Sequence, residues 1–117
     1  MLSLRSNVVV VARSRAVLDA LAAQHSAHVE VVAADLGNPA TGQHVVDAAL
    51  ARWGRLDGLV VNHGVLEPVQ RVADADLEEW RRAFDVNLFS AVALVCASEG
   101  ARLPRKPQAG AVADGCA

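Results

Sequence analysis

The sequence predicts an α/β domain built around a parallel sheet. Valine-rich runs alternate along the 117-residue chain with segments of helical periodicity, which is the pattern of strand–helix–strand units. The apolar residues are mostly Val, Ala and Leu, and aromatic residues make up only 3% of the chain. Continuous β-branched runs are typical of strands buried on both faces, and such strands belong to parallel sheets that helices cover.

Three strands are predicted from these runs. Residues 7–12, NVVVVA, end at Arg13, and residues 28–34, HVEVVAA, end at Asp35. Residues 56–61, LDGLVV, lead into an Asn-His-Gly turn. A polar side chain therefore follows each predicted strand.

Three helices are predicted between and after the strands. Residues 16–24 place their apolar side chains on one side, as in a short helix. A Gly-Asn-Pro turn at residues 37–39 precedes a helix that ends at Gly54, a residue typical of C-terminal caps. After a long loop, a capping box at Asp76 opens the last helix, residues 76–99.

The last helix is expected to bury one stripe of side chains. The stripe recurs at spacings of three and four and consists of Leu77, Trp80, Phe84, Asn87, Leu88, Ala91 and Val95. Residues 1–99 are therefore predicted to form the folded domain. Residues 100–117 are rich in Gly, Ala and Pro, and we expect them to form a disordered tail.

The composition argues against several classes of partner. The net charge is −2 with the signs interspersed, whereas nucleic acids and anionic membranes are bound through basic clusters. No run approaches the ~20 apolar residues of a membrane span, and the start of the chain lacks the pattern of a signal peptide. Cys96 and Cys116 lack ligand-like spacing, so no metal site is expected. We expect a cytoplasmic protein that binds neither nucleic acid nor membrane.

The residues that follow the strands are candidates for a ligand site, because ligands of parallel sheets bind beyond the carboxyl ends of the strands. After the third strand, Asn62 offers an amide, His63 offers a flat ring, and Gly64 allows close approach of a ligand. These three residues would equally suit a turn that ends the strand without any ligand.

Arg13 and Ser14 occupy the position after the first strand. In dinucleotide-binding folds an acidic residue there bonds the ribose 2′-hydroxyl, whereas an arginine accommodates a 2′-phosphate. A guanidinium matches phosphate geometry with several donors, although a surface arginine at a strand end needs no ligand. Asp35, followed by Leu36, either accepts a hydrogen bond from an adenine amino group or caps the turn after the second strand.

Asn87 lies on the predicted inner stripe of the last helix. A buried amide costs free energy unless it finds hydrogen-bond partners. Those partners belong either to the protein itself or to a functional site.

Four segments together resemble the short-chain dehydrogenases/reductases. They are VVVVARS, VVAADL, DGLVVNHG and WRRAFDVNLFSAVAL, and their order and spacing match this family over residues 7–98. The resemblance implies a Rossmann-like, doubly wound parallel sheet and an oxidoreductase that transfers hydride between NAD(P)(H) and a small carbonyl or alcohol substrate. The stretch NHGVLEP is most similar to the sepiapterin-reductase-like branch.

The resemblance also implies roles for the residues at the strand ends. The cofactor-binding residues would be Arg13, Ser14, Asp35, Leu36, Asn62, His63 and Gly64. His63 departs from the alanine that is usual in the family's Asn-Ala-Gly turn, and Arg13 favours NADP over NAD. Asn87 matches an active-site asparagine that helps to hold a proton-relay water, which is a supporting catalytic role.

Several parts of the family pattern are absent from this sequence. It contains no TGxxxGxG turn and no tyrosine, and its only lysine is Lys106. The resemblance therefore implies a partial fold of three strands and three helices, truncated at both ends, without the family's first strand and C-terminal half. We expect such a chain to be catalytically inactive, to bind the cofactor poorly and to be marginally stable.

The missing first strand bears directly on the geometry of the sheet. In the doubly wound order it lies between the second and fourth strands, which correspond here to residues 7–12 and 56–61. Its absence leaves either a strand-wide gap or strands that close up on each other.

Two alternatives to an oxidoreductase fragment remain open. One is a non-catalytic interaction module, because the helix at residues 76–99 packs against a partner subunit in many members of the family. It would pair this chain with another copy or with a full-length paralogue. The other is a small α/β domain unrelated to nucleotides.

Overall fold

The computed structural model describes residues 6–102 of the chain. Its elements are β1 (Val8–Ala12), α1 (Arg15–Gln24), β2 (Val29–Ala33), α2 (Thr41–Trp53), η1 (Val72–Asp74), α3 (Leu77–Phe84), η2 (Asp85–Phe89) and α4 (Ser90–Arg102). The segment η1 is a 3₁₀ turn and η2 is a π-helical turn, and α3, η2 and α4 run on as one continuous helix. Residues 103–117 of the predicted tail lie outside the described residues.

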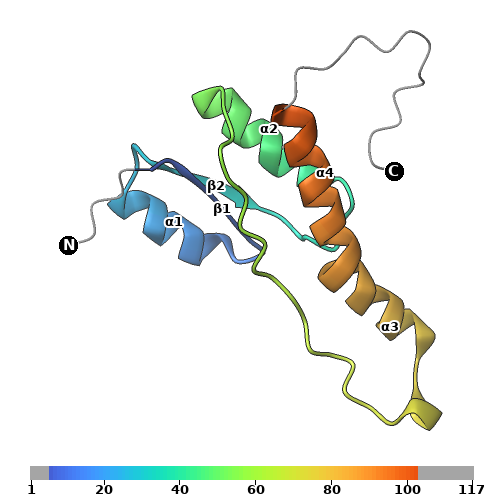
Figure 1. Ribbon diagram of the computed structural model, residues 1–117. Helices are drawn as coiled ribbons and strands as arrows, with labels where there is room; N and C mark the ends of the chain where they lie inside the picture. The colour runs from blue at the N-terminus through green and yellow to red at the C-terminus, as the bar shows by residue number, and fades with distance from the viewer. Residues whose placement is uncertain (1–5, 103–117) are drawn as a thin grey trace, which may run out of the picture.

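The order of strand, helix, strand and helix is as predicted, and the two strands pair in parallel. The register runs from Val8 opposite Val29 to Ala12 opposite Ala33. Helix α1 covers one face of the pair, and α2 with α4 covers the other face (Figure 1). The core on this second face is formed by Val32, Val45 and Leu94, with Val9, Val11 and Leu59 packed against them.

The strand predicted at residues 56–61 does not form. This segment runs past the free edge of β1 without joining the sheet (Figure 1). A cavity of about 800 Å³ is lined by Val9 of β1 and by Leu59 of the segment. A strand needs a hydrogen-bonded neighbour, and the cavity separates this segment from β1, so it is bonded to no strand within residues 6–102. The sequence predicted either a strand-wide gap between residues 7–12 and 56–61 or strands that close up on each other, and the structure has the gap.

Helices α2 and α4 pack closely because a glycine lies between them. A Cβ atom built on Gly42 of α2 would lie 3.0 Å from the carbonyl carbon of Ala93 in α4. Leu94 and Ser98 of α4 are buried, and α2 is the main packing partner of that helix. The contact fixes α4 over the sheet.

The stripe predicted to be buried on the last helix is exposed. Trp80, Phe84 and Leu88 are 38%, 49% and 46% exposed. The buried residues of this helix lie on a different face, and they are Ser90, Leu94 and Ser98. Periodicity identifies the apolar faces of a helix, but the face that is buried depends on where the rest of the chain packs. Here the described residues leave the more apolar face largely uncovered.

The continuous helix Leu77–Ala101 is long and apolar enough to cross a membrane by length and composition alone, with a mean hydropathy of 1.3 over an 18-residue window. A single helix of this kind is not a clear membrane span, because the core helix of a folded domain passes the same test. The first turns of the helix carry Glu78, Glu79, Arg81 and Arg82, and its other end packs on α2. Both features are typical of an amphipathic helix that packs within a folded domain.

The described fold leaves much of its apolar surface open. Its radius of gyration is 16.9 Å, whereas a compact domain of this length has a radius of about 13 Å. Val60, Leu66 and Val69 in the irregular segment are almost fully exposed. Even a complete domain is stable by only about 5–15 kcal/mol, so an incomplete core supports the expectation of marginal stability.

Substituting Gly42→Ala should lower the stability of the fold. The added Cβ has no room against the backbone of Ala93, and overpacking of this kind costs about 1–3 kcal/mol. Gly100→Ala in α4 is the matched control, because nothing lies within 4 Å of its added Cβ and alanine favours a helix by about 1 kcal/mol. Urea unfolding followed by far-UV circular dichroism should give a lower midpoint for Gly42→Ala than for the unsubstituted chain. An equal or higher midpoint would contradict the close contact of α2 with α4.

Candidate functional site

The parallel ladder brings the ends of β1 and β2 to one edge of the sheet. The Ala34 N–H donates to the Ala12 carbonyl at 3.1 Å, which extends the ladder to the points where Arg13 and Asp35 follow the strands. Arg13 is exposed and has no hydrogen bond or ion pair with any other described residue. Ser14 stands at the N-cap of α1 without a side-chain capping bond. A guanidinium and a hydroxyl are therefore available to a ligand at this edge.

Asp35 caps the turn that leads from β2 into α2. Its Oδ1 accepts a hydrogen bond from the Gly37 N–H at 2.9 Å, and its main-chain carbonyl accepts one from the Thr41 hydroxyl at 2.6 Å. The turn-capping interpretation of Asp35 therefore holds, and its exposed carboxylate still has acceptor positions for a ligand. Leu36 is half-buried, packs against the core and lines the cavity beside β1.

His63 is held by the last helix. Its Nε2 lies 2.5 Å from Ser90 Oγ and 3.1 Å from the carbonyl oxygen of Val86. The Ser90 hydroxyl also donates to the Val86 carbonyl at 2.5 Å, so the three polar groups form one closed network. Ser90 is missing from the predicted set of site residues. Its signal in the sequence is a hydroxyl within an apolar helix, because such a group needs a partner when it is buried.

The π-helical turn η2 makes this network possible. The Ser90 N–H bonds the carbonyl of Asp85, whereas in a regular α-helix it would bond the carbonyl of Val86. The Val86 carbonyl is released from that amide and accepts from side chains instead. The turn therefore attaches the segment around His63 to the last helix.

Asn87 binds the loop backbone in the manner of a neighbouring strand. Its Nδ2 donates to the Val65 carbonyl at 2.8 Å, and its Oδ1 accepts from the Val65 N–H at 2.7 Å. The protein itself therefore satisfies this amide, although Asn87 is exposed and does not lie on a buried stripe as predicted. A Cβ on Gly64 would lie 3.1 Å from Asn87 Oδ1, and Gly64 has no positive φ. Glycine at this position makes room for Asn87.

The predicted site residues fall into neighbouring groups. Leu36, Asn62 and His63 line the cavity beside β1. The others do not line it: Arg13, Ser14 and Asp35 stand at the strand ends, Gly64 contacts Asn87, and Asn87 lines a second cavity of about 260 Å³. Within residues 6–102 no group of His, Cys, Asp and Glu side chains is arranged to hold a metal ion.

Substituting Asn87→Ala should loosen the loop that begins at Val65. The change removes both hydrogen bonds to Val65, each worth about 0.5–1.5 kcal/mol. Asn62→Ala is the matched control, because Asn62 is exposed and forms no hydrogen bond within the described part of the chain. Trypsin should cleave after the exposed Arg71 several-fold faster in Asn87→Ala than in Asn62→Ala. Equal rates would show that Asn87 does not hold the loop.

Comparison with known proteins identifies relatives of this chain. The family model described as Enoyl-(Acyl carrier protein) reductase matches residues 5–112. The benzil reductase ((S)-benzoin forming) of Saccharomyces cerevisiae is 37% identical over 90 residues, which cover 73% of this chain and 34% of that protein. An uncharacterized oxidoreductase of the same yeast is 40% identical over 85 residues, with the same coverage of 73% and 34%.

Solved structures lead to the same group of proteins. The crystal structure of that uncharacterized oxidoreductase, described as a short-chain dehydrogenase/reductase, gives a TM-score of 0.79 at 36% identity, over 84% of this chain and 39% of the other. A cytoplasmic protein with unknown function from the same yeast gives a TM-score of 0.74 at 36% identity, over 85% and 40% of the two chains.

The chain spans about a third of the length of these curated relatives, 34% in both yeast alignments. The range that the family model matches, residues 5–112, contains the parallel pair of strands and the polar residues at their ends. The chain therefore belongs to the short-chain dehydrogenase/reductase family of NAD(P)-dependent oxidoreductases.

Proposed function

We propose that this chain carries the adenosine-binding part of an NADP(H)-dependent oxidoreductase that acts on a small carbonyl or alcohol. The proposal is carried by one observation: Arg13 and Asp35 leave adjacent parallel strands at the same edge of the sheet. In open parallel sheets this edge is where nucleotides bind. Leu36 and Asn62 line the adjoining cavity and would continue the same surface.

The choice of NADP(H) over NAD(H) rests on Arg13. Its exposed guanidinium has no partner among the described residues, and its geometry suits a 2′-phosphate. Leu36 would offer an apolar contact to the adenine, and Asp35 would accept a hydrogen bond from its amino group. These residues fit the adenosine half of the dinucleotide. The sequence has no glycine-rich turn for the pyrophosphate, so we expect the chain to bind the whole cofactor weakly.

The bound cofactor supplies the hydride in reactions of this family. The residues of this chain would contribute by holding backbone segments in place. His63 holds its segment against the last helix, and Asn87 holds the loop at Val65. We assign Asn87 a positioning role and no direct chemical step. The sequence contains no tyrosine, and its only lysine, Lys106, lies outside the described residues, so no proton donor is assigned. The 117-residue chain by itself should not complete a reduction.

The substrate class and the cellular location are proposed from the relatives. A yeast relative is named as a benzil reductase, which supports a small carbonyl compound or alcohol as substrate of the complete site. A yeast structural neighbour is described as a cytoplasmic protein, which supports a cytoplasmic location. The net charge of −2 with interspersed signs gives no reason to propose nucleic acid as a partner.

The role of Arg13 predicts a difference between two adenosine nucleotides. In nuclear magnetic resonance titrations, 2′,5′-ADP should bind more tightly than 5′-AMP, because only the former has a 2′-phosphate. Arg13→Ala should weaken 2′,5′-ADP about tenfold or more, since hydrogen bonds to charged groups are worth about 1.5–3 kcal/mol. Arg15→Ala is the matched control, because Arg15 is paired with Asp19 at 3.3 Å. Equal binding of the two nucleotides would exclude the assignment of NADP(H).

The missing proton donor predicts an inactive chain. The purified protein mixed with NADPH and benzil should cause no loss of NADPH absorbance above the rate without protein. The full-length yeast benzil reductase serves as the positive control. Steady oxidation of NADPH by the 117-residue chain would show that another group donates the proton.

A second candidate function is a non-catalytic interaction module. It is favoured by the exposed apolar face of the continuous helix, which is formed by Trp80, Phe84, Leu88, Val92 and Val95. A contiguous apolar face of this kind marks contacts between proteins. In this function the helix Leu77–Ala101 would pair with another copy of the chain or with a full-length paralogue.

Size-exclusion chromatography tests this second function. The chain should co-elute with a full-length paralogue, and Leu88→Glu should abolish co-elution because it places a charge on the exposed apolar face. Val17→Glu in α1 is the control, because Val17 is also exposed but lies on a different helix. Separate elution of the unsubstituted chain from the paralogue would reject the interaction module.

A further inference from the structure

We propose that His63 is a positioning residue for Asn87. Through Ser90 and the carbonyl of Val86, its imidazole holds the π-helical turn η2 in place, and this turn determines the direction in which Asn87 points. The role deepens the proposed function and rests on it, since Asn87 is a positioning residue of the proposed site. The contacts that carry it join the segment at residues 63–65 to the last helix.

The hydrogen positions in the network follow from the Val86 carbonyl, which can only accept. The Ser90 hydroxyl has a single hydrogen, and it donates that hydrogen to Val86 at 2.5 Å. His63 Nε2 lies 3.1 Å from the same carbonyl oxygen and 2.5 Å from Ser90 Oγ, so Nε2 must carry a hydrogen to bond either oxygen. The neutral imidazole is therefore assigned to the tautomer with its hydrogen on Nε2.

The Val86 carbonyl needs side-chain donors because η2 removes its main-chain donor. The Ser90 N–H bonds the carbonyl of Asp85 and so leaves the carbonyl of Val86 without that amide. A main-chain carbonyl inside a folded protein must find a donor elsewhere. The Ser90 hydroxyl and the His63 ring supply it, and Ser90 is only 4% exposed. These two donors favour the π spacing over the α-helical one, in which the Ser90 N–H would bond Val86 directly.

The spacing at η2 sets the rotation of the residues that precede Ser90. A π turn holds about one residue more than an α-helical turn, and one residue of an α-helix corresponds to a rotation of about 100°. α4 is fixed against such a rotation, because Gly42 of α2 packs against Ala93 and Leu94 is buried. A return to α-helical spacing would therefore rotate the residues before Ser90, and with them Asn87 in the middle of η2.

Asn87 makes contacts that tolerate little rotation. Its side-chain amide bonds both the N–H and the carbonyl of Val65, at 2.7 Å and 2.8 Å. Its Oδ1 would lie 3.1 Å from a Cβ atom on Gly64, so the loop backbone passes close to it. Two hydrogen bonds to one residue fix the direction of the amide, and rotation of the helix would break both. The pairing of Asn87 with Val65 therefore depends on η2.

The turn after β2 also holds Val86. A Cβ atom on Gly37 would lie 3.1 Å from Val86 Cγ2, so the valine side chain lies against this turn. Asp35, which closes the turn through the Gly37 N–H at 2.9 Å, is one of the proposed adenosine contacts. Val86 is thus held by its side chain and by its carbonyl, and the two contacts lead to different parts of the proposed site.

The test uses the whole 117-residue chain, labelled with an isotope of nitrogen, and two substitutions that differ in reach. The amide nitrogen of glutamine lies as many bonds from the backbone as Nε2 of histidine, whereas that of asparagine lies nearer. His63→Gln should therefore keep the contact with Val86, and His63→Asn should lose it. Hydrogen exchange followed by nuclear magnetic resonance reports on the Asn87 pairing through the Val65 N–H and on η2 through the Ser90 N–H.

In His63→Asn both amides should exchange about three- to tenfold faster than in the unsubstituted chain, which is the effect of one lost hydrogen bond. In His63→Gln both rates should match those of the unsubstituted chain. The Ala34 N–H, which bonds Ala12 in the ladder at 3.1 Å, is the internal control and should keep its rate in both variants. Long-range nitrogen–hydrogen spectra of the unsubstituted chain should show the hydrogen of the neutral His63 ring on Nε2.

Ser90→Ala gives a second measurement that leaves His63 in place. It removes the hydroxyl from the side of the helix and should also accelerate exchange at Val65. An unchanged Val65 rate in this variant, equal rates in His63→Gln and His63→Asn, or a ring hydrogen on Nδ1 alone would overturn the proposal. Acceleration of Val65 without Ser90 in His63→Asn would also overturn it, because His63 would then tether only its own segment. The same holds if Ala34 accelerates equally, since the substitution would then act on the whole fold.

These measurements contain no cofactor, so they are separable from the test of the proposed function. Equal binding of 2′,5′-ADP and 5′-AMP would reject the assignment of NADP(H) and leave the role of His63 standing. Slow exchange at Val65 in His63→Asn would reject the role of His63 and leave the assignment of Arg13 standing.

Discussion

The hydrogen-bond ladder between β1 and β2 is the constraint on which the other features depend. Its parallel register places Arg13 and Asp35 at one edge of the sheet, where a nucleotide can reach both. The same ladder uses only every second residue of β1. The backbone groups of Val9 and Val11 are consequently directed away from β2, to the side of β1 where the described chain supplies no strand. One pairing rule thus determines both the ligand-binding edge and the open cavity.

The polar residues around the strand ends have structural tasks that are compatible with binding. Asp35 closes a turn through Gly37, His63 joins a network with Ser90, and Asn87 pairs with Val65 as a strand would. Each of these contacts fixes a backbone segment: the turn after β2, the segment around His63, and the loop at Val65. A site is most effective when its groups are held in place before the ligand arrives, because less ordering is then needed on binding. The structural roles of these residues are therefore compatible with a role in binding a ligand.

The order of elements could be predicted because it depends on local pattern. Valine runs, the turn at residues 37–39 and the cap at Gly54 are local signals, and β1, β2 and α2 follow them. The prediction of a strand at residues 56–61 was wrong because a strand must pair with a neighbour, and the local sequence does not show whether that neighbour is present. The prediction of which face of the last helix is buried was wrong for the same reason. Trp80 and Phe84 lie on a face that the described residues leave largely exposed.

The candidate site was predictable in its outline and not in its contacts. Parallel strands deliver their ends to one edge, so the location of Arg13 and Asp35 followed from topology. The partnership of His63 with Ser90 depends on the π turn at η2, and the sequence contains no signal for an altered hydrogen-bond spacing. The role of Gly64 likewise depends on its distance to Asn87 and not on its own backbone angle.

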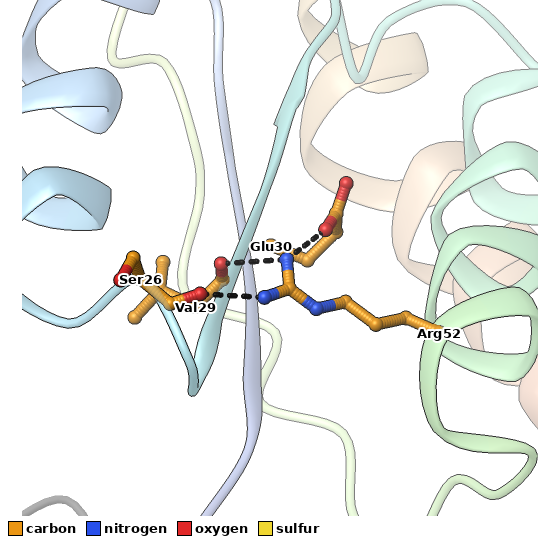
Figure 2. A network of polar contacts seen from close by, with 4 residues as sticks. All are labelled: Ser26, Val29, Glu30 and Arg52. Carbon is orange, nitrogen blue, oxygen red and sulfur yellow. Dashed lines mark hydrogen bonds and ion pairs between the residues drawn. The ribbon is translucent and has the colours of Figure 1, made fainter.

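Arg52 lies against the outer edge of β2, where its guanidinium bonds the carbonyls of Val29 and Ser26 (Figure 2). A sheet with two open edges can recruit chains from both sides, and each newcomer then offers an edge to the next, which is the route to fibres. In the described residues the outer edge of β2 is blocked at its start by a charged side chain, and the segment at residues 56–61 lies across a cavity from the free side of β1. Growth of the sheet from the edge of β2 is therefore opposed at its first residues.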